Sequence, residues 1–258
     1  MSLQHENSRR LFIKQLLSIT AIGALAPSAL AQSLSRQKIK ALAFDAFPIF
    51  DPRPVFAMAE KIFPGKGQEL SNLWRTRQFE YQWLRALSGE YKDFKTVTQD
   101  ALVFAANTMQ LDLSDENRAA LMDTYFNLKI WPDVLPALKA LHNAGIKLVF
   151  LSNMTEDMLR RNMEANGISS LMYAVYSTDS NHSYKPSTKA YQIAVDKLKL
   201  RKTDIGFVAF AGWDASGAKL FGYPTYWVNR QNQKKEELGA TADWTGNNLT
   251  ELVKHLGV

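Results

Sequence analysis

The chain has 258 residues, a formal net charge of +6, four histidines and no cysteine. Without cysteine it has neither a disulfide nor a thiolate site, and the histidines lack the spacing of zinc ligands. The positive charge is spread along the sequence without a basic stripe, so nucleic acid is not an expected partner.

The first 31 residues are predicted to be an export signal. Residues 8–14 read Ser-Arg-Arg-Leu-Phe-Ile-Lys, which resembles a twin-arginine motif, and an apolar stretch, 16–25, follows. Residues 29–31, Ala-Leu-Ala, fit a cleavage site. About ten apolar residues are too few to span a bilayer comfortably. A retained anchor or a disordered tail is the alternative. We expect a periplasmic protein without membrane contact after cleavage.

Cleavage after Ala31 removes 31 of the 258 residues, among them three basic and one acidic residue. The mature chain then has 227 residues and a net charge of +4. That length is sufficient for a substantial core and a small inserted domain.

The first element of the expected core is a buried strand over residues 41–44. A short apolar run bounded by helix breakers suits the centre of a parallel sheet. Asp45 then lies at the carboxyl end of that strand, where open α/β sheets bind their ligands. An Asp there is a candidate nucleophile that forms an acyl-enzyme ester. A turn or a helix N-cap is its alternative role.

The pattern between residues 52 and 130 is helical. Apolar residues recur at helical spacing in the segments 55–63, 68–88, 93–110 and 114–128. Gly89 breaks the pattern, as does the Pro-Gly pair at 64–65, and Ser114 is a good N-cap. A helical block inserted after the first strand predicts a cap over the active edge of the sheet.

Helix and strand alternate from residue 133 onward. Further strands are predicted at 146–151, 174–177, 205–209 and 225–228, with helices at 133–145, 155–165, 187–199 and 215–221. This alternation predicts an α/β core with a doubly wound, Rossmann-like parallel sheet. Residues 38–51 and 131–258 form that core, and residues 52–130 form the inserted helical cap.

Five segments, in this order, resemble the haloacid dehalogenase superfamily and, within it, the type II (S)-2-haloacid dehalogenases. They are 44–47 (Phe-Asp-Ala-Phe), 73–84 (Leu-Trp-Arg-Thr-Arg-Gln-Phe-Glu-Tyr-Gln-Trp-Leu), 151–153 (Leu-Ser-Asn), 184–191 (Tyr-Lys-Pro, then Tyr) and 213–230 (from Trp-Asp-Ala-Ser-Gly-Ala to Asn-Arg). The resemblance covers roughly residues 38 to 245. It implies hydrolytic dehalogenation of short 2-haloalkanoic acids through an aspartyl ester, without a metal or other cofactor.

The resemblance assigns four residues to the catalytic machinery. Asp45 is the nucleophile, and Lys185 keeps it ionised. Asp214 orients or activates the hydrolytic water, and Ser152 binds the carboxylate of the substrate or of Asp45. Each has an ordinary alternative: a solvated lysine in a loop, or a helix N-cap for the serine and the aspartates.

Further residues are expected to bind the substrate and the halide. By resemblance, Arg75 reaches from the cap to the departing halide, since a guanidinium offers several donors and stays charged. Asn153 contributes to the halide cradle, and Tyr191 is a tyrosine of the site, unless it is only part of the core. The candidates for an apolar wall around the substrate are Phe47, Phe94 and Trp213, of which Phe94 equally suits the cap core.

The chain also departs from the family pattern. That pattern reads Asp-x-Tyr-Gly-Thr-Leu-Phe-Asp at the first motif, whereas residues 45–51 are one residue shorter and lack the threonine. Phe47 lacks the tyrosine hydroxyl, and Ala209 and Ala211 stand where Ser and Asn are common. Two alternatives follow: a catalytically weak or idle binding protein, or a hydrolase of another C–X substrate.

A phosphatase of the same superfamily is less favoured. Those enzymes carry a second Asp two residues after the nucleophile, where this chain has Phe47. Their final loop typically supplies two acids, whereas Asp214 stands alone here. With so few hard oxygen ligands, no magnesium site is expected.

A homodimer is expected from resemblance and from apolar residues on one cap segment. These are Trp74, Phe79, Tyr81, Trp83, Leu84 and Leu87, more apolar surface than one helix normally buries against one neighbour. A helix buried on two sides inside its own cap is the alternative.

Overall fold

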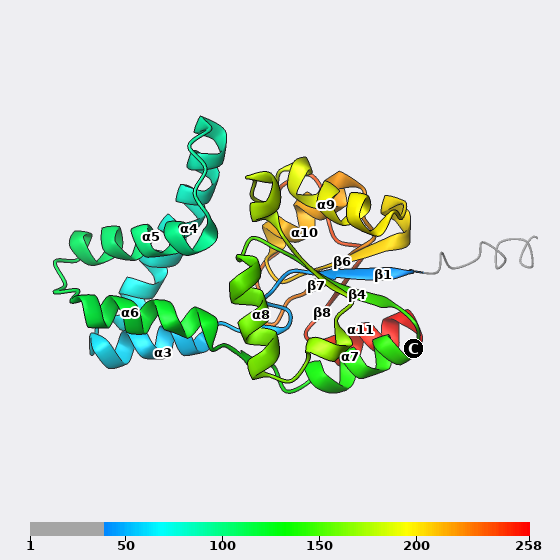
Figure 1. The fold of residues 1–258 in the computed structure, drawn as a ribbon, viewed down its shortest axis with the longest axis horizontal. Coiled ribbons are helices and arrows are strands. Elements are labelled where there is room, and N and C mark those ends of the chain that lie inside the picture. Colours follow the sequence, from blue (N-terminus) through cyan, green and yellow to red (C-terminus); the bar gives the residue numbers. More distant parts are fainter. Residues whose placement is uncertain (1–38) are drawn as a thin grey trace, which may run out of the picture. The chain divides into compact units, whose positions relative to one another are not determined.

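A six-stranded parallel sheet forms the core of the part that the structure describes, residues 39–258 of a computed structural model (Figure 1). The strands are β1 (Ala41–Phe44), β4 (Lys147–Ser152), β5 (Ala174–Ser177), β6 (Ile205–Ala209), β7 (Thr225–Val228) and β8 (Trp244–Gly246). Their spatial order is β5-β4-β1-β6-β7-β8, and all neighbours pair in parallel. The predicted doubly wound sheet is confirmed. The predicted export signal lies outside the described residues.

Helices cover both faces of this sheet. One face is covered by α7 (Val134–Asn143), α8 (Glu156–Ala165) and α11 (Leu249–Leu256), the other by α9 (Thr188–Leu198) and α10 (Gly212–Phe221) (Figure 1). Because side chains alternate along a strand, Leu42 and Phe44 pack into the first layer, and Ala41 and Ala43 into the second. All four are fully buried, which explains why β1 is apolar throughout.

Four helices inserted after β1 form the helical cap, coloured cyan to green in Figure 1. They are α3 (Arg53–Ile62), α4 (Gly67–Ser88), α5 (Phe94–Thr108) and α6 (Asp115–Asp123). Gly89 ends α4 with a φ of +82°, which glycine adopts without strain. Ser114 caps α6, and its hydroxyl accepts the N–H of Asn117 at 3.2 Å. The helical block predicted from the sequence is therefore present.

A short antiparallel ribbon lies where the chain leaves and re-enters the core. It pairs β2 (Phe50–Asp51) with β3 (Lys129–Ile130). Two-residue strands have no periodicity to detect, so the sequence did not predict them. The ribbon therefore holds the two crossings side by side. The boundaries at 51/52 and 130/131 stay a prediction.

Other differences are confined to the ends of elements and to the C-terminus. The helix predicted over 114–128 ends at Asp123 and continues as a 3₁₀ turn, Thr124–Phe126, where the Thr124 hydroxyl donates to Leu121 O. β8 and α11 were not predicted. Three further 3₁₀ turns are Ser169–Leu171, Thr178–Asn181 and Lys202–Asp204. Over the described residues, no helix is both long and apolar enough to cross a membrane.

Candidate active site

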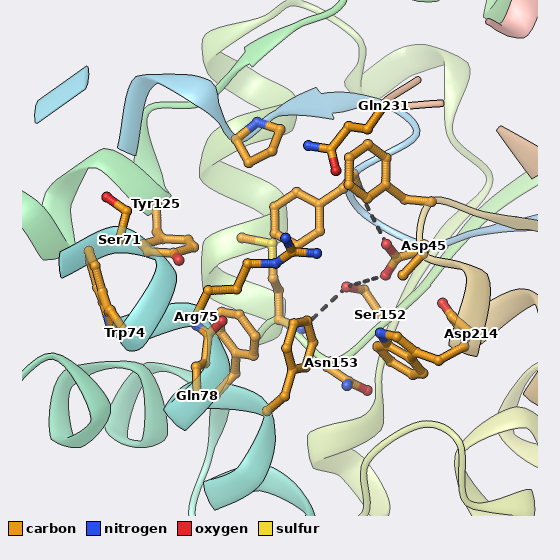
Figure 2. A pocket seen from close by; sticks show the side chains of 18 of the residues that line it. Asp45, Ser71, Trp74, Arg75, Gln78, Tyr125, Ser152, Asn153, Asp214 and Gln231 are labelled. Atoms are coloured by element: carbon orange, nitrogen blue, oxygen red, sulfur yellow. Dashed lines mark hydrogen bonds between the residues drawn. The ribbon is translucent and has the colours of Figure 1, made fainter. Parts of the chain in front are cut away.

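Asp45 follows β1 directly, at the carboxyl edge of the sheet. Its backbone N–H donates to Val208 O of β6 at 3.0 Å, so the strand register continues through this residue. Its Oδ2 accepts the backbone N–H of Phe47 at 3.3 Å. The residue is 8% exposed, and its side chain faces the cavity shown in Figure 2. Asp45 is thus a fixed carboxylate at the position where doubly wound sheets bind ligands.

Lys185 bridges the two carboxylates of the site. Its Nζ donates to Asp45 Oδ1 at 2.8 Å and to Asp214 Oδ2 at 2.7 Å, and the residue is 1% exposed. Burial by itself lowers the pKa of Lys185, but the two carboxylates outweigh it and leave the pKa raised. The ammonium therefore stays charged, and its two ion pairs compensate its burial.

Asp214 lies in the first turn of α10, because that helix begins at Gly212 and not at residue 215 as predicted. Its Oδ1 accepts the Tyr191 hydroxyl at 2.7 Å, opposite the bond from Lys185. Burial raises the pKa of Asp214 to about 6, although Lys185 opposes the shift. A carboxylate with this pKa can accept a proton from water near neutral pH.

Tyr191 is completely buried on α9 and serves Asp214. Burial raises the pKa of Tyr191 well above its usual value, so the phenol remains a hydrogen-bond donor. Gly217 of α10 permits this contact, because a Cβ there would lie 2.6 Å from the Tyr191 hydroxyl oxygen. Tyr191 is not among the residues that line the cavity. Substrate binding by Tyr191 stays a prediction, and the geometry supports orientation of Asp214.

Ser152 is the last residue of β4, beside β1, and Asn153 follows it. Ser152 Oγ lies 3.5 Å from Asp45 Oδ1 and accepts the backbone N–H of Met154 at 3.2 Å. Asn153 Oδ1 accepts the backbone N–H of Lys185 at 3.0 Å. Thr155, not Ser152 or Asn153, is the N-cap of α8, accepting the N–H of Met158. The helix-capping alternative for Ser152 is therefore wrong.

Arg75 reaches from α4 into the cavity (Figure 2). Burial lowers the pKa of Arg75, but a guanidinium remains charged at any relevant pH. It lies over the ring of Phe79, 5.7 Å from the centroid. Among residues 39–258, the guanidinium makes no hydrogen bond or ion pair with a side chain or the backbone. It is therefore available to an anion in the cavity.

A cavity of about 60 Å³, measured as the space open to the centre of a water molecule, lies between cap and core. The predicted site residues on its wall are Asp45, Phe47, Arg75, Phe94, Ser152, Asn153, Trp213 and Asp214. The predicted apolar wall is thus assembled from both cap and core. Phe94 is 3% exposed and also packs against Tyr125 in the cap, so both of its expected positions hold. Lys185 lies behind the wall.

The sequence-based prediction missed several residues around the cavity. Phe210 packs on Phe47 with ring centroids 5.9 Å apart, and Phe79 packs on Trp213 at 5.4 Å. Other lining residues that were not predicted are Pro52, Phe56, Ser71, Trp74, Gln78, Tyr125, Met154, Ala211 and Gln231. Phe79 belongs to the cap segment already singled out, and its four-residue spacing from Arg75 places both on one helix face. Gln231 offered no signal in the sequence.

Because some hydroxyl and amide side chains of the family pattern are absent here, few groups hold the Asp45 carboxylate. Ala209 and Ala211 contribute no polar side chain, so Asp45 is held by Lys185, Ser152 and the N–H of Phe47. No group of three His, Cys, Asp or Glu side chains within residues 39–258 could hold a metal ion. The buried carboxylate of Asp45 faces the cavity and is paired with Lys185 on the core side. The unpaired guanidinium of Arg75 lies on the cap side of the cavity. A carboxylate nucleophile on a capped, doubly wound sheet defines a class of α/β hydrolases that form aspartyl intermediates.

Comparison with known proteins names the family. The model for haloacid dehalogenase-like hydrolases matches residues 26–222, and the chain belongs to this family. Haloacetate dehalogenase H-2 of Moraxella sp. (strain B) is 38% identical over 210 residues, which are 81% of this chain and 94% of that protein. The (S)-2-haloacid dehalogenase of Pseudomonas sp. (strain YL) is 37% identical over 217 residues, 84% of this chain and 94% of that protein.

A solved structure agrees with the fold. The L-2-haloacid dehalogenase from Xanthobacter autotrophicus, with chloropropionic acid covalently bound, superposes with a TM-score of 0.78 at 30% identity. The alignment covers 85% of this chain and 98% of that chain. Core and cap are therefore both part of the similarity.

Proposed function

We propose that this protein hydrolyses the carbon–halogen bond of short 2-haloalkanoic acids through an ester on Asp45. The observation that carries the proposal is the charge arrangement along the cavity. Asp45 is paired with Lys185 at one side, and Arg75 lies unpaired on the cap side. The relatives act on haloacetate and on (S)-2-haloacids, and one relative holds chloropropionic acid covalently.

The first step is displacement at C2. A carboxylate oxygen of Asp45 attacks C2 in line and forms a C–O bond, while the C–halogen bond breaks and the halide leaves with its electron pair. The configuration at C2 inverts, so an (S)-2-haloacid gives an ester of the (R)-2-hydroxy acid. Charge grows on the halide in the transition state, and Arg75 is the cation placed to stabilise it.

The second step is hydrolysis of the ester. Water attacks the carboxyl carbon of Asp45, and Asp214 orients it and accepts its proton. Lys185, 2.8 Å from Asp45 Oδ1, stabilises the negative charge of the tetrahedral intermediate. The bond between Cγ and the ester oxygen then breaks, and the proton held by Asp214 passes to that oxygen, which releases the 2-hydroxy acid. The second proton of the water leaves to solvent as Asp45 returns to its carboxylate form. The net reaction consumes one water and produces one halide ion and one proton.

Cavity size supports a short substrate. A volume of 60 Å³ holds roughly four to six water-sized groups, since each occupies about 10–15 Å³ of such space. Haloacetate and 2-halopropionate fall in this range, and the walls of Phe47, Phe94 and Trp213 suit a methyl group at C2.

The experiment that tests the proposal compares four substrates. The purified protein is incubated with chloroacetate, each enantiomer of 2-chloropropionate and an aryl phosphate, with and without magnesium. We expect chloride release from chloroacetate and from the (S) enantiomer, independent of magnesium. Phosphate release that needs magnesium would contradict the proposal, and release of neither ion would leave a binding protein or a hydrolase of another C–X substrate.

The rate of ester hydrolysis should depend on the protonation of Asp214. Its pKa of about 6 includes a contribution from the Asp45 charge, which the ester removes, so the ester form titrates at or below about pH 6. The rate is expected to be flat from about pH 8 to pH 7 and to fall as Asp214 gains its proton at lower pH. Rapid-quench kinetics of the ester decay measure this rate at each pH. A midpoint above pH 7 would contradict the assignment.

We infer that the chain is exported by the twin-arginine pathway to the periplasm. The support is the signal pattern of residues 8–31, outside the described residues. In a bacterium with an intact pathway, the full-length precursor should be converted to a shorter periplasmic form, and replacing Arg9 and Arg10 by Lys should retain it in the cytoplasm. A precursor that stays full-length and cytoplasmic would contradict the inference.

We also infer a homodimer that involves α4. Trp74 is buried inside the cap and Trp83 packs on Trp213, so the alternative of internal burial accounts for these two residues. Leu84 and Leu87 on the same helix are 60% and 86% exposed. Light scattering at micromolar concentration should give twice the mass of one chain, and Leu87→Glu should reduce it. A single-chain mass for the unmodified protein would contradict the inference.

A further inference from the structure

Gln82 of α4 is fully buried and touches the active-site loop after β4. Its Oε1 accepts Asn153 Nδ2 at 2.9 Å, which joins the cap to the core. The next residue, Trp83, donates its Nε1–H to the backbone carbonyl of Lys185 at 3.1 Å. The C-terminal half of α4 therefore contacts the segment of Ser152 and Asn153 as well as the segment of Lys185.

The direction of the Asn153 amide is determined by its neighbours. Its Oδ1 accepts the backbone N–H of Lys185 at 3.0 Å and the Thr178 hydroxyl at 3.3 Å. Two donors therefore face one end of the amide, and Nδ2 must face the other. Nδ2 carries two hydrogens. One is donated to Gln82, and over residues 39–258 the other has no protein acceptor, while Asn153 lines the cavity.

Packing alone does not explain a glutamine at this position. Its Nε2 is buried without a hydrogen-bond partner, an arrangement that costs stability. An apolar side chain of similar length would fill the same volume without that cost. What such a side chain lacks is the acceptor for Asn153. The property that distinguishes Gln82 is therefore its effect on the Asn153 amide.

We propose that Gln82 is a positioning residue that aims the second N–H of Asn153 at the leaving halide. The two donors at Oδ1 determine which end of the Asn153 amide faces them, and the bond to Gln82 holds the other end in place. Without Gln82 the amide would be free to pivot about Oδ1, which would change the direction of its second N–H. The inference rests on the proposed dehalogenation, because it needs a halide that leaves toward Asn153. Through Gln82 on α4, the cap then determines the direction of the Asn153 N–H, a hydrogen-bond donor of the core.

The test uses Gln82→Met, which keeps the length of the side chain and removes the acceptor. We expect kcat/KM for (S)-2-chloropropionate to fall about tenfold, the usual order for loss of a group that orients a functional side chain. The loss should be smaller for (S)-2-bromopropionate, because bromide leaves more readily and needs less stabilisation. The bromide-to-chloride ratio of kcat/KM should therefore rise several-fold, while Tm is unchanged or higher.

Two further variants separate positioning from folding. Gln82→Glu keeps an acceptor oxygen for Asn153, and burial favours its neutral, protonated form, so the bromide-to-chloride ratio should move back toward that of the unmodified protein. Ser114→Ala removes the N-cap hydroxyl of α6, which accepts the N–H of Asn117 inside the cap, and Ser114 does not line the cavity. It should lower Tm without a change in the ratio.

The outcomes distinguish the positioning role of Gln82 from the proposed dehalogenase function. A Gln82→Met protein with an unchanged ratio, or with equal losses on both halides that follow Tm, would overturn the positioning role while leaving the dehalogenase function intact. If the unmodified protein releases no halide from either substrate, the proposed function fails first, and the positioning role fails with it.

Discussion

Asp45→Asn is expected to abolish dehalogenation, with a fall in kcat on the order of 10⁴-fold or more, because an amide does not form the ester. The side chain keeps its shape, and its one oxygen can take the Oδ1 position and accept from Lys185 and Ser152, while Phe47 N–H loses its acceptor. Halide release at saturating (S)-2-chloropropionate measures the loss. A residual rate within about tenfold of the unmodified protein would rule out Asp45 as the nucleophile.

An isotope experiment distinguishes the ester from direct attack by water. With enzyme in excess over substrate in ¹⁸O-labelled water, one turnover should place ¹⁸O in the Asp45 carboxylate, and the 2-hydroxy acid should be unlabelled. Mass spectrometry of the peptide that contains Asp45 reads this out. Label in the product and none in Asp45 after a single turnover would exclude the ester.

The matched control is Asp51→Asn. Asp51 is also a buried carboxylate on the same loop, but it pairs with Arg53 and does not line the cavity. Its replacement removes an ion pair near the β2–β3 ribbon and should lower Tm with only a modest effect on kcat. A loss as large as that of Asp45→Asn would indicate that the loop, and not the nucleophile, is responsible.

Lys185→Met should have the largest effect on stability as well as a severe effect on activity. Removing one partner of a buried ion pair typically costs about 3–5 kcal/mol, because the remaining charges stay buried without compensation. Here two carboxylates lose their common cation, since Lys185 Nζ lies 2.8 Å from Asp45 and 2.7 Å from Asp214. Activity should fall by at least about 10²-fold, the scale of one lost transition-state donor.

The stability loss should depend on pH in a definite direction. Without Lys185 the pKa of Asp214, already raised by burial, rises further, so the folded variant binds a proton more readily than the unfolded chain. Protonation removes the uncompensated charge, and the free-energy difference from the unmodified protein should shrink between about pH 7 and pH 5. Urea unfolding at both pH values measures this difference.

Lys189→Met is the control for this variant. Lys189 is exposed on α9, four residues further along, and its replacement also removes one positive charge. Surface changes of this kind usually stay within about 0.5 kcal/mol. A similar loss in both variants, or a loss for Lys185→Met that does not change with pH, would contradict the proposed role of the buried ion pairs.

The positions of the strand ends predicted which polar residues lie together at the site. Asp45, Ser152 and Asp214 each follow an apolar run, and parallel strands bring their carboxyl ends to one edge. The pairing of β1 with β4 and β6 then places the first two side by side. Lys185 and Arg75 were found through the family resemblance, because a lysine in a loop and an arginine on a helix have no periodic signal of their own.

Contacts between distant segments were beyond the reach of sequence reasoning. Tyr191 was expected at the site through the family resemblance, but the hydrogen bond from its hydroxyl to Asp214 on another helix was not predicted. The bond from Gln82 to Asn153 joins residues 71 positions apart and depends on how the cap packs on the core. Such contacts are decided by side-chain packing, which no local pattern encodes.

Within residues 39–258, the sequence by itself determined five of the six strands of the main sheet, the inserted helical block and the place of Asp45 after β1, since local periodicity and breakers specify elements and their ends. Only the tertiary structure decided which donors hold the Asp45 carboxylate and which residues line the cavity. It also decided that Lys185 pairs with both carboxylates. Those properties arise from groups that approach each other only when the cap and the sheet are packed together, so they follow from three-dimensional distance and burial and not from order along the chain.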